Sequence, residues 1–255
     1  MASHVRYRVV IKDFEILNID NSIINNRKIA YNNEIDIREE KTILNISLQE
    51  IEVNNKIFVI EVTSDKDLFE QELMPLAMKY VDNLLNKIAF YFQNAKVGEP
   101  WILDTYFMDK KTGTTELPCS VIVSTENRDK KLLDILCHEI KNNKNFDKEE
   151  YNLFRAAMNN EDVVVKYMFL YQILSFKHLN SNGFESQNIV DDFIKSKFTE
   201  DKHMFQRWSD SGREETIYTR LRNQVGHFRG KTSQETRSVM NAKIHELIEL
   251  VKMSI

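Results

Sequence analysis

The hydrophobic pattern of this chain changes near residues 124–128, and this change constrains the fold more than any other feature. Before it, short runs rich in β-branched and aromatic residues predict strands, with one long helical segment over residues 67–94. After it, apolar residues recur only at helical spacing. The sequence therefore predicts an α+β protein of two domains. Residues 1–126 form an antiparallel β-sheet with one long helix, and residues 127–255 form an all-α helical bundle.

The first domain is expected to hold hairpins and a strongly amphipathic helix. Asn54-Asn55 and residues 111–113 have the composition of turns, and Pro75 is expected in the first turn of the helix. Strands are expected over residues 6–17, 42–48, 56–63, 101–110 and 119–124. The apolar face of the helix consists of Leu73, Ala77, Val81, Leu84, Leu85, Ile88 and Phe92.

The second domain is expected to bury its helices against one another. The segment 161–179 is apolar almost all round, which predicts that it lies at the centre of the bundle. Asp147 with Glu150, and Thr232 with Glu235, have the spacing of helix-starting caps. Helices are expected over residues 128–143, 147–160, 161–179, 186–198, 213–228 and 232–253.

Charge and cysteine content narrow the classes of protein to which this chain could belong. The net charge of −4 makes the whole molecule a poor polyanion binder, so nucleic-acid contact requires a local patch. Residues 202–231 provide one, with seven basic and three acidic side chains, although such runs are also common on solvated faces. Cys119 and Cys137 lack disulfide-framework or metal-binding spacing, which favours a reducing, cytoplasmic setting. No signal peptide, membrane segment, metal or cofactor is expected.

The stretch "LRNQVGH", residues 221–227, combines residue types suited to phosphodiester chemistry. On an ideal helix Asn223 and His227 are neighbours, on a face turned away from the apolar stripe. Arg222 lies about 140° from His227, so a break near Gly226 is expected to bring the two together. The apolar stripe, which is expected to face the core, consists of Ile217, Leu221, Val225 and Phe228.

Three side chains of this stretch could act on RNA without a metal. An imidazole such as that of His227 can move a proton near neutral pH, and a guanidinium such as that of Arg222 can hold two phosphate oxygens. The amide of Asn223 can orient one of these groups. Arg220 and Arg229, from the same basic segment, are expected to support substrate binding.

This pattern resembles the R-x4-6-H signature of the HEPN superfamily, in which a polar residue commonly follows the arginine. The likeness covers roughly residues 128–255. It implies a metal-independent endoribonuclease, commonly a homodimer with two Arg/His sets in one cleft, that acts as a toxin or in abortive-infection and phage defence. Arg222 would stabilise the transition state, His227 would be the general acid/base and Asn223 would support them. Phe228 departs from the R-x4-H-x-Y form of a toxin subclass.

Other functions stay open at this point. The bundle could be an inactive HEPN-like interaction or ligand-binding module, or the polar face of its helix could simply be solvated. A nucleic-acid-binding adaptor is a third possibility. The first domain carries no catalytic set, and we expect it to sense a regulatory ligand or partner protein, to hold the nuclease inactive or to dimerise. Cys137 beside His138 is expected to be a partly buried thiol and not a nucleophile.

Overall fold

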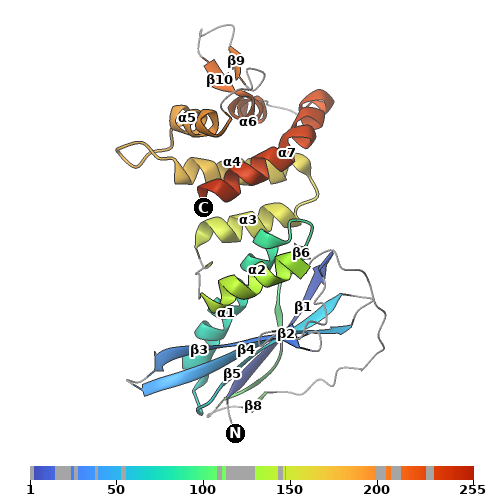
Figure 1. Ribbon diagram of the computed structural model, residues 1–255, viewed down its shortest axis with the longest axis vertical. Coiled ribbons are helices and arrows are strands. Elements are labelled where there is room, and N and C mark those ends of the chain that lie inside the picture. Colours follow the sequence, from blue (N-terminus) through green and yellow to red (C-terminus); the bar gives the residue numbers. More distant parts are fainter. Residues whose placement is uncertain are drawn as a thin grey trace. The chain divides into compact units, whose positions relative to one another are not determined.

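The chain forms two compact units, Met1–Tyr151 and Asn152–Ile255, which combine a sheet with helices (Figure 1). This mixture confirms the predicted α+β class. The computed structural model describes residues 3–14, 24–25, 28–37, 40–52, 56–107, 111–112, 130–142, 146, 148–198, 205–207, 214–227 and 233–255.

The first unit is built on an antiparallel sheet. Its strands are β1 (His4–Lys12), β2 (Ile24–Asn25), β3 (Lys28–Ile37), β4 (Glu40–Glu52), β5 (Ile57–Ser64), β6 (Lys96–Val97), β7 (Trp101–Tyr106) and β8 (Lys111–Thr112). The order across the sheet is β2-β3-β4-β5-β1-β7-β8, and β6 pairs with β1. Alternate side chains of β1, from Val5 to Ile11, are buried, as expected for a strand with one face on the core.

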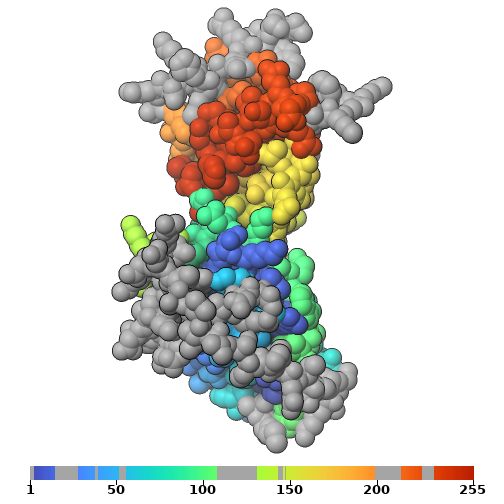
Figure 2. Space-filling view, turned by 90° about the vertical axis from the view of Figure 1, so that its right-hand side faces the viewer, coloured from blue at the N-terminus to red at the C-terminus, as the bar shows by residue number. Residues whose placement is uncertain are grey.

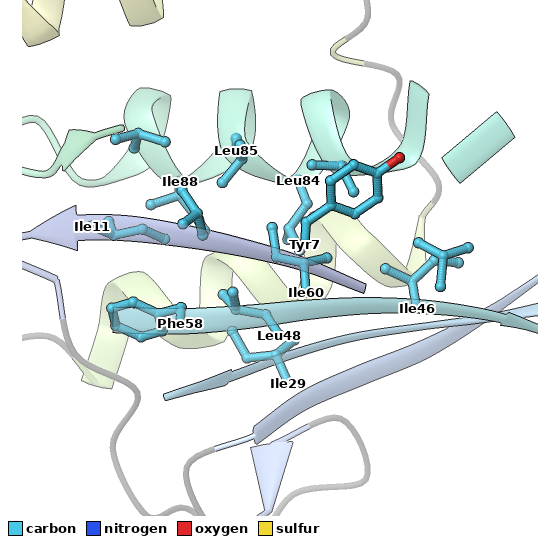
Figure 3. Close-up of a cluster of buried hydrophobic side chains, with 14 of the residues drawn as sticks. Tyr7, Ile11, Ile29, Ile46, Leu48, Phe58, Ile60, Leu84, Leu85 and Ile88 are labelled. Carbon is cyan, nitrogen blue, oxygen red and sulfur yellow. The ribbon is translucent and has the colours of Figure 1, made fainter. Parts of the chain in front are cut away.

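The helix α1 (Glu70–Tyr91) packs on the sheet and forms the core of the first unit (Figure 3). All seven apolar residues predicted for its inner face are buried. Leu84, Leu85 and Ile88 point toward sheet residues such as Ile60 (Figure 3). The helical spacing of apolar residues therefore predicted this packing face correctly.

The start of α1 differs from the expectation in one respect. The carboxylate of Glu72 accepts a hydrogen bond from the backbone N–H of Phe69 at 2.9 Å, which satisfies one exposed donor of the first turn. The helix begins at Glu70, so Pro75 lies in its second turn and not in the first. Proline at that position cannot donate the bond that would reach the carbonyl of Gln71.

The helix α2 (Lys130–Lys141) belongs to the first unit, although residues 127–255 were expected to form the second domain. It packs against α1, and its apolar face joins the core of the sheet unit. The residues that do so are Leu133, Leu136, Cys137 and Ile140. The compact units therefore divide at 151/152, later in the chain than residue 126.

Some strands of the sheet were not predicted. β3 pairs with β4 along its whole length. Ile29 is buried, and the alternate residues Tyr31, Ile35 and Ile37 pack partly buried against the core, so the strand has an apolar alternation that is interrupted at Asn33. Residues 111–112 form the short strand β8 against β7, where a turn was expected. The expected strand over 119–124 lies outside the described residues.

The second unit is mainly helical, but the expectation of an all-α unit is wrong. β9 (Phe205–Arg207) and β10 (Glu214–Thr216) form a two-stranded antiparallel ribbon, and β10 leads directly into the next helix. The helices are α3 (Glu149–Asn159), whose first turn falls in the first unit, and α4 (Val163–Lys177), α5 (Gln187–Lys197), α6 (Ile217–His227) and α7 (Gln234–Ser254). The C-terminal helix α7, in red, forms much of one face of this unit (Figure 2).

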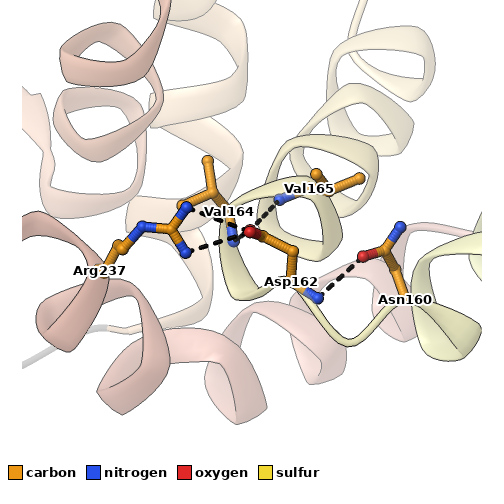
Figure 4. Close-up of polar contacts among 5 residues, drawn as sticks. All are labelled: Asn160, Asp162, Val164, Val165 and Arg237. Carbon is orange, nitrogen blue, oxygen red and sulfur yellow. Dashed lines mark hydrogen bonds and ion pairs between the residues drawn. The ribbon is translucent and has the colours of Figure 1, made fainter. Parts of the chain in front are cut away.

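The helix α4 lies at the centre of the second unit, as predicted, and packs against α5, α6 and α7. Tyr167, Leu170 and Leu174 are fully buried, whereas Val165 and Phe176 are exposed, so the helix is not enclosed all round. Asp162 caps its N-terminus by accepting hydrogen bonds from the backbone N–H groups of Val164 and Val165 (Figure 4).

The start of α7 differs by one residue from the predicted cap. Ser233 is the N-cap residue, and its hydroxyl accepts a hydrogen bond from the backbone N–H of Thr236 at 3.1 Å. The expected cap residue, Thr232, lies outside the described residues, as does Asp147 at the start of α3.

Candidate functional site

The predicted site lies on α6, which begins where the ribbon strand β10 ends. Ile217 and Leu221 of the predicted stripe are buried, Val225 is half-buried, and Phe228 lies outside the described residues. The helix continues through Gly226 to His227, so the expected break is not present. A single glycine costs a helix only about 1 kcal/mol, which the packing of α6 can offset.

Arg222 is half-buried and is held by two neighbours. Its Nη1 donates a hydrogen bond to Oδ1 of Asn223 at 3.1 Å. Its guanidinium carbon lies 6.0 Å from the centre of the Tyr171 ring on α4, at the outer limit of a cation–π contact. The arginine is thus oriented by protein groups while part of its surface stays open to solvent.

Asn223 does not lie on an outward face, contrary to the prediction. It is only 9% exposed, and its amide takes part in four hydrogen bonds within the unit. Besides the bond from Arg222, its amide exchanges two hydrogen bonds with Gln187 of α5 and donates a third to Glu215 of β10 at 3.2 Å. At Asn223, therefore, the helix packs against other elements of the same unit.

Tyr171 lies in the segment that was predicted to be at the centre of the bundle, and it is almost fully buried. Its hydroxyl lies 2.7 Å from Oγ1 of Thr219 on α6. Burial raises the pKa of the Tyr171 hydroxyl well above its usual value, and the charge of Arg222 opposes part of that rise. The tyrosine is thus a neutral group beneath the arginine.

Sequence reasoning missed the polar partners of this site, chiefly Gln187 and Glu215. A usable signal for Gln187 was its spacing of four residues from Asp191, which aligns two polar side chains on one face of α5. Glu215 stands eight residues before Asn223 and lies on the strand β10, outside the helix, so helical spacing could not reveal that contact.

The remaining predicted site residues are only partly defined. Arg220 is half-buried on α6, and its side chain is not among the polar groups around Arg222 and Asn223 described above. His227 is the last residue of α6, but its side chain lies outside the described residues. Arg229 lies outside them entirely. The structure therefore brings Arg222 and Asn223 together and places the backbone of His227 one turn beyond them.

Elsewhere in the chain, Cys137 has the character of a core residue, as expected. It is 3% exposed, and burial raises the pKa of its thiol to about 11, which disfavours the reactive thiolate. Within the described ranges, no three His, Cys, Asp or Glu side chains are grouped so that they could hold a metal. No helix in the described part of the chain is long and apolar enough to cross a membrane.

Comparison with protein-family models, with curated proteins and with solved structures found no match to this chain. The geometry of the residues around α6 is therefore the basis on which a function is proposed.

Proposed function

We propose that the second unit is a HEPN-type, metal-independent endoribonuclease domain that works as a homodimer in the cytoplasm, in phage or stress defence. The observation that carries the proposal is Arg222, a partly exposed arginine oriented by Asn223 and Tyr171 on the helix that ends at His227. A guanidinium held in one orientation is suited to a phosphate whose charge grows in the transition state.

The proposed reaction is an internal transesterification of RNA. The 2′-hydroxyl loses its proton and attacks the adjacent phosphorus, while the bond to the 5′-oxygen breaks and that oxygen gains a proton. The products are a 2′,3′-cyclic phosphate and a 5′-hydroxyl. His227 is the proposed acid/base that moves these protons, Arg222 stabilises the phosphorane-like transition state, and Arg220 and Arg229 support RNA binding.

Substitution of the two proposed catalytic residues tests this function. We expect His227→Ala and Arg222→Ala to cleave total RNA at least about 100-fold more slowly than the wild type in EDTA, because each removes a group that acts in the transition state. His245→Ala, which removes an exposed histidine from α7, is the matched control and should cleave normally. Product ends are checked for cyclic phosphate. Equal cleavage by wild type and His227→Ala, or a need for divalent metal, contradicts the proposal.

A second function is favoured by the internal position of Asn223. All of its hydrogen bonds described above are made within the unit, as expected for a residue that stabilises the fold of an interaction module. In that case Arg222→Ala and His227→Ala would keep the effect of the wild type on cell growth when overexpressed. A loss of toxicity in both variants, with normal expression, favours the nuclease instead.

The proposed role of the first unit is regulatory. Its sheet and α1 provide an independent core, and we propose that it binds a ligand or partner protein that controls cleavage. Removal of that control should change the rate of RNA cleavage and leave the bond that is cut unchanged.

A further inference from the structure

Two polar links, one helical turn apart, join α5 to α6. Gln187 and Asp191 lie four residues apart on α5, and Thr219 and Asn223 lie four residues apart on α6, so each pair shares one face of its helix. Gln187 meets Asn223, and Asp191 meets Thr219. The two helices are therefore matched in register along this contact.

The first link is a reciprocal pair of amides. Nε2 of Gln187 donates to Oδ1 of Asn223 at 2.9 Å, and Nδ2 of Asn223 donates back to Oε1 of Gln187 at 3.3 Å. The same Oδ1 accepts the hydrogen bond from Arg222. Gln187, together with the carboxylate of Glu215, which accepts a hydrogen bond from the same Nδ2, fixes which way the Asn223 amide faces. That orientation decides whether Arg222 meets an acceptor or a donor.

The second link centres on a buried carboxylate. Asp191 is 2% exposed, and its Oδ1 accepts hydrogen bonds from the backbone N–H and the hydroxyl of Thr216 and from the hydroxyl of Thr219. The hydroxyl of Thr219 donates its one hydrogen bond to Asp191. It therefore accepts a hydrogen bond from the hydroxyl of Tyr171. Asp191 therefore anchors the first turn of α6 and, through Thr219, the tyrosine whose ring lies beside Arg222.

We infer that Gln187 and Asp191 of α5 are positioning residues that set the orientation of Arg222, one through Asn223 and the other through Thr219 and Tyr171. The inference rests on the proposed function where it concerns cleavage, but the contacts that carry it do not. A buried carboxylate beside polar groups could instead serve stability alone. The two roles can be told apart, because replacement of a positioning residue changes the orientation of Arg222 in a protein that is still folded.

The amide link is the better one to test, because Gln187 is half-buried in the first turn of α5 and its replacement should leave the fold intact. In Gln187→Ala, which removes both hydrogen bonds to the Asn223 amide, we expect kcat for RNA cleavage to fall about tenfold, with KM nearly unchanged. Combining it with Asn223→Ala should cost no more than Asn223→Ala alone. The exchanged pair Gln187→Asn with Asn223→Gln keeps both amides and should recover most of the lost activity.

Gln172→Ala is the matched control, because Gln172 of α4 donates to Glu185 and makes no contact with α6 among the bonds described. For the second link, Thr219→Val removes the hydroxyl at similar volume and should lower kcat, whereas Thr219→Ser should retain it. If Gln187→Ala cleaves like Gln172→Ala, the inference is overturned. A loss in Gln187→Ala that adds fully to the loss in Asn223→Ala also overturns it, since Gln187 then acts elsewhere.

A spectroscopic readout separates failure of this inference from failure of the proposed function. If the wild type cleaves no RNA, the proposed function fails, and the side-chain Nε–H resonance of Arg222 still reports on its orientation. A shifted or broadened Arg222 resonance in Gln187→Ala, restored in the exchanged pair, supports the inference. A resonance identical to that of the wild type in Gln187→Ala overturns it.

Discussion

At the scale of single residues, Asp162 shows how one side chain can secure a helix of the second unit. It accepts hydrogen bonds from the backbone of Val164 at 2.8 Å and Val165 at 3.3 Å, and both terminal nitrogens of Arg237 donate to its other oxygen at 3.1 Å (Figure 4). The bond from Val164 is the main cause that lowers the pKa of this carboxyl below its usual value.

Replacement of this cap should destabilise the second unit. We expect Asp162→Ala to lower the free energy of unfolding by about 1 kcal/mol, with at most about 1 kcal/mol more from the exposed pair with Arg237. Asp162→Asn keeps an acceptor oxygen and should lose less. Urea unfolding followed by circular dichroism measures both, and an unchanged midpoint for Asp162→Ala would show that the cap contributes nothing.

The same residue predicts a dependence of stability on pH. The folded-state pKa of Asp162 is depressed, so its contribution is complete above the unfolded value of about 3.9 and is lost as the pH falls through the folded value. The wild type should therefore lose more stability than Asp162→Asn when acidified below about pH 4. If the wild type and Asp162→Asn lose equal stability on acidification, this pH dependence does not come from Asp162.

The candidate site was only partly predictable from single residues. Arg222, Asn223 and His227 were expected on one helix and lie on α6, but Asn223 was expected to face outward. A helical wheel compares a residue only with its own helix, whereas Asn223 is buried by Gln187 and Glu215 of other elements. Pairings between polar side chains so far apart in sequence leave no periodic signal.

At the scale of elements, α1 was predicted well because its pattern is long and regular. β3 was not predicted, since its alternation of apolar residues is interrupted at Asn33 and most of them are only partly buried against the core. The ribbon of β9 and β10 was missed for a similar reason: strands of three residues are too short for alternation to be recognised.

The position of Pro75 in α1 makes a prediction about that helix. Pro75 is exposed in the second turn, so Pro75→Ala should restore a backbone hydrogen bond to Gln71 without a clash. Proline in a helix interior is about 3 kcal/mol less favourable than alanine, but it also stiffens the unfolded chain, which offsets part of that cost. We therefore expect Pro75→Ala to raise the free energy of unfolding of the first unit by about 1 kcal/mol or more. Met78→Ala, at an exposed position of the same helix, is the control. A lower denaturation midpoint for Pro75→Ala would contradict the expectation.

At the scale of the whole molecule, the boundary between the units was not predictable from the change of pattern alone. An amphipathic helix such as α2 has one apolar face, and the sequence does not state which core receives it. In the structure that face joins the core of the sheet and α1, so the change from strands to helices precedes the end of the first unit.

Because each unit has its own buried core, we expect a core substitution to destabilise mainly the unit that contains it. Ile88 is buried in the core of the first unit, and Ile248 is buried on α7 in the second. Each Ile→Val substitution should cost about 0.5–1.5 kcal/mol. Hydrogen exchange should accelerate mainly within residues 3–151 for Ile88→Val and within residues 152–255 for Ile248→Val, so each variant is the control for the other. Equal acceleration in both units by either variant would show that they unfold as one.

The amide pair of Gln187 and Asn223 has a consequence for the chemistry of titration. Neither amide gains or loses a proton between acid and alkaline solution, so this link to Arg222 keeps its donors and acceptors throughout. A guanidinium likewise stays charged over that range. If the chain cleaves RNA as proposed, the pH dependence of its rate reports on groups that gain or lose protons, His227 first among them, and not on this amide pair.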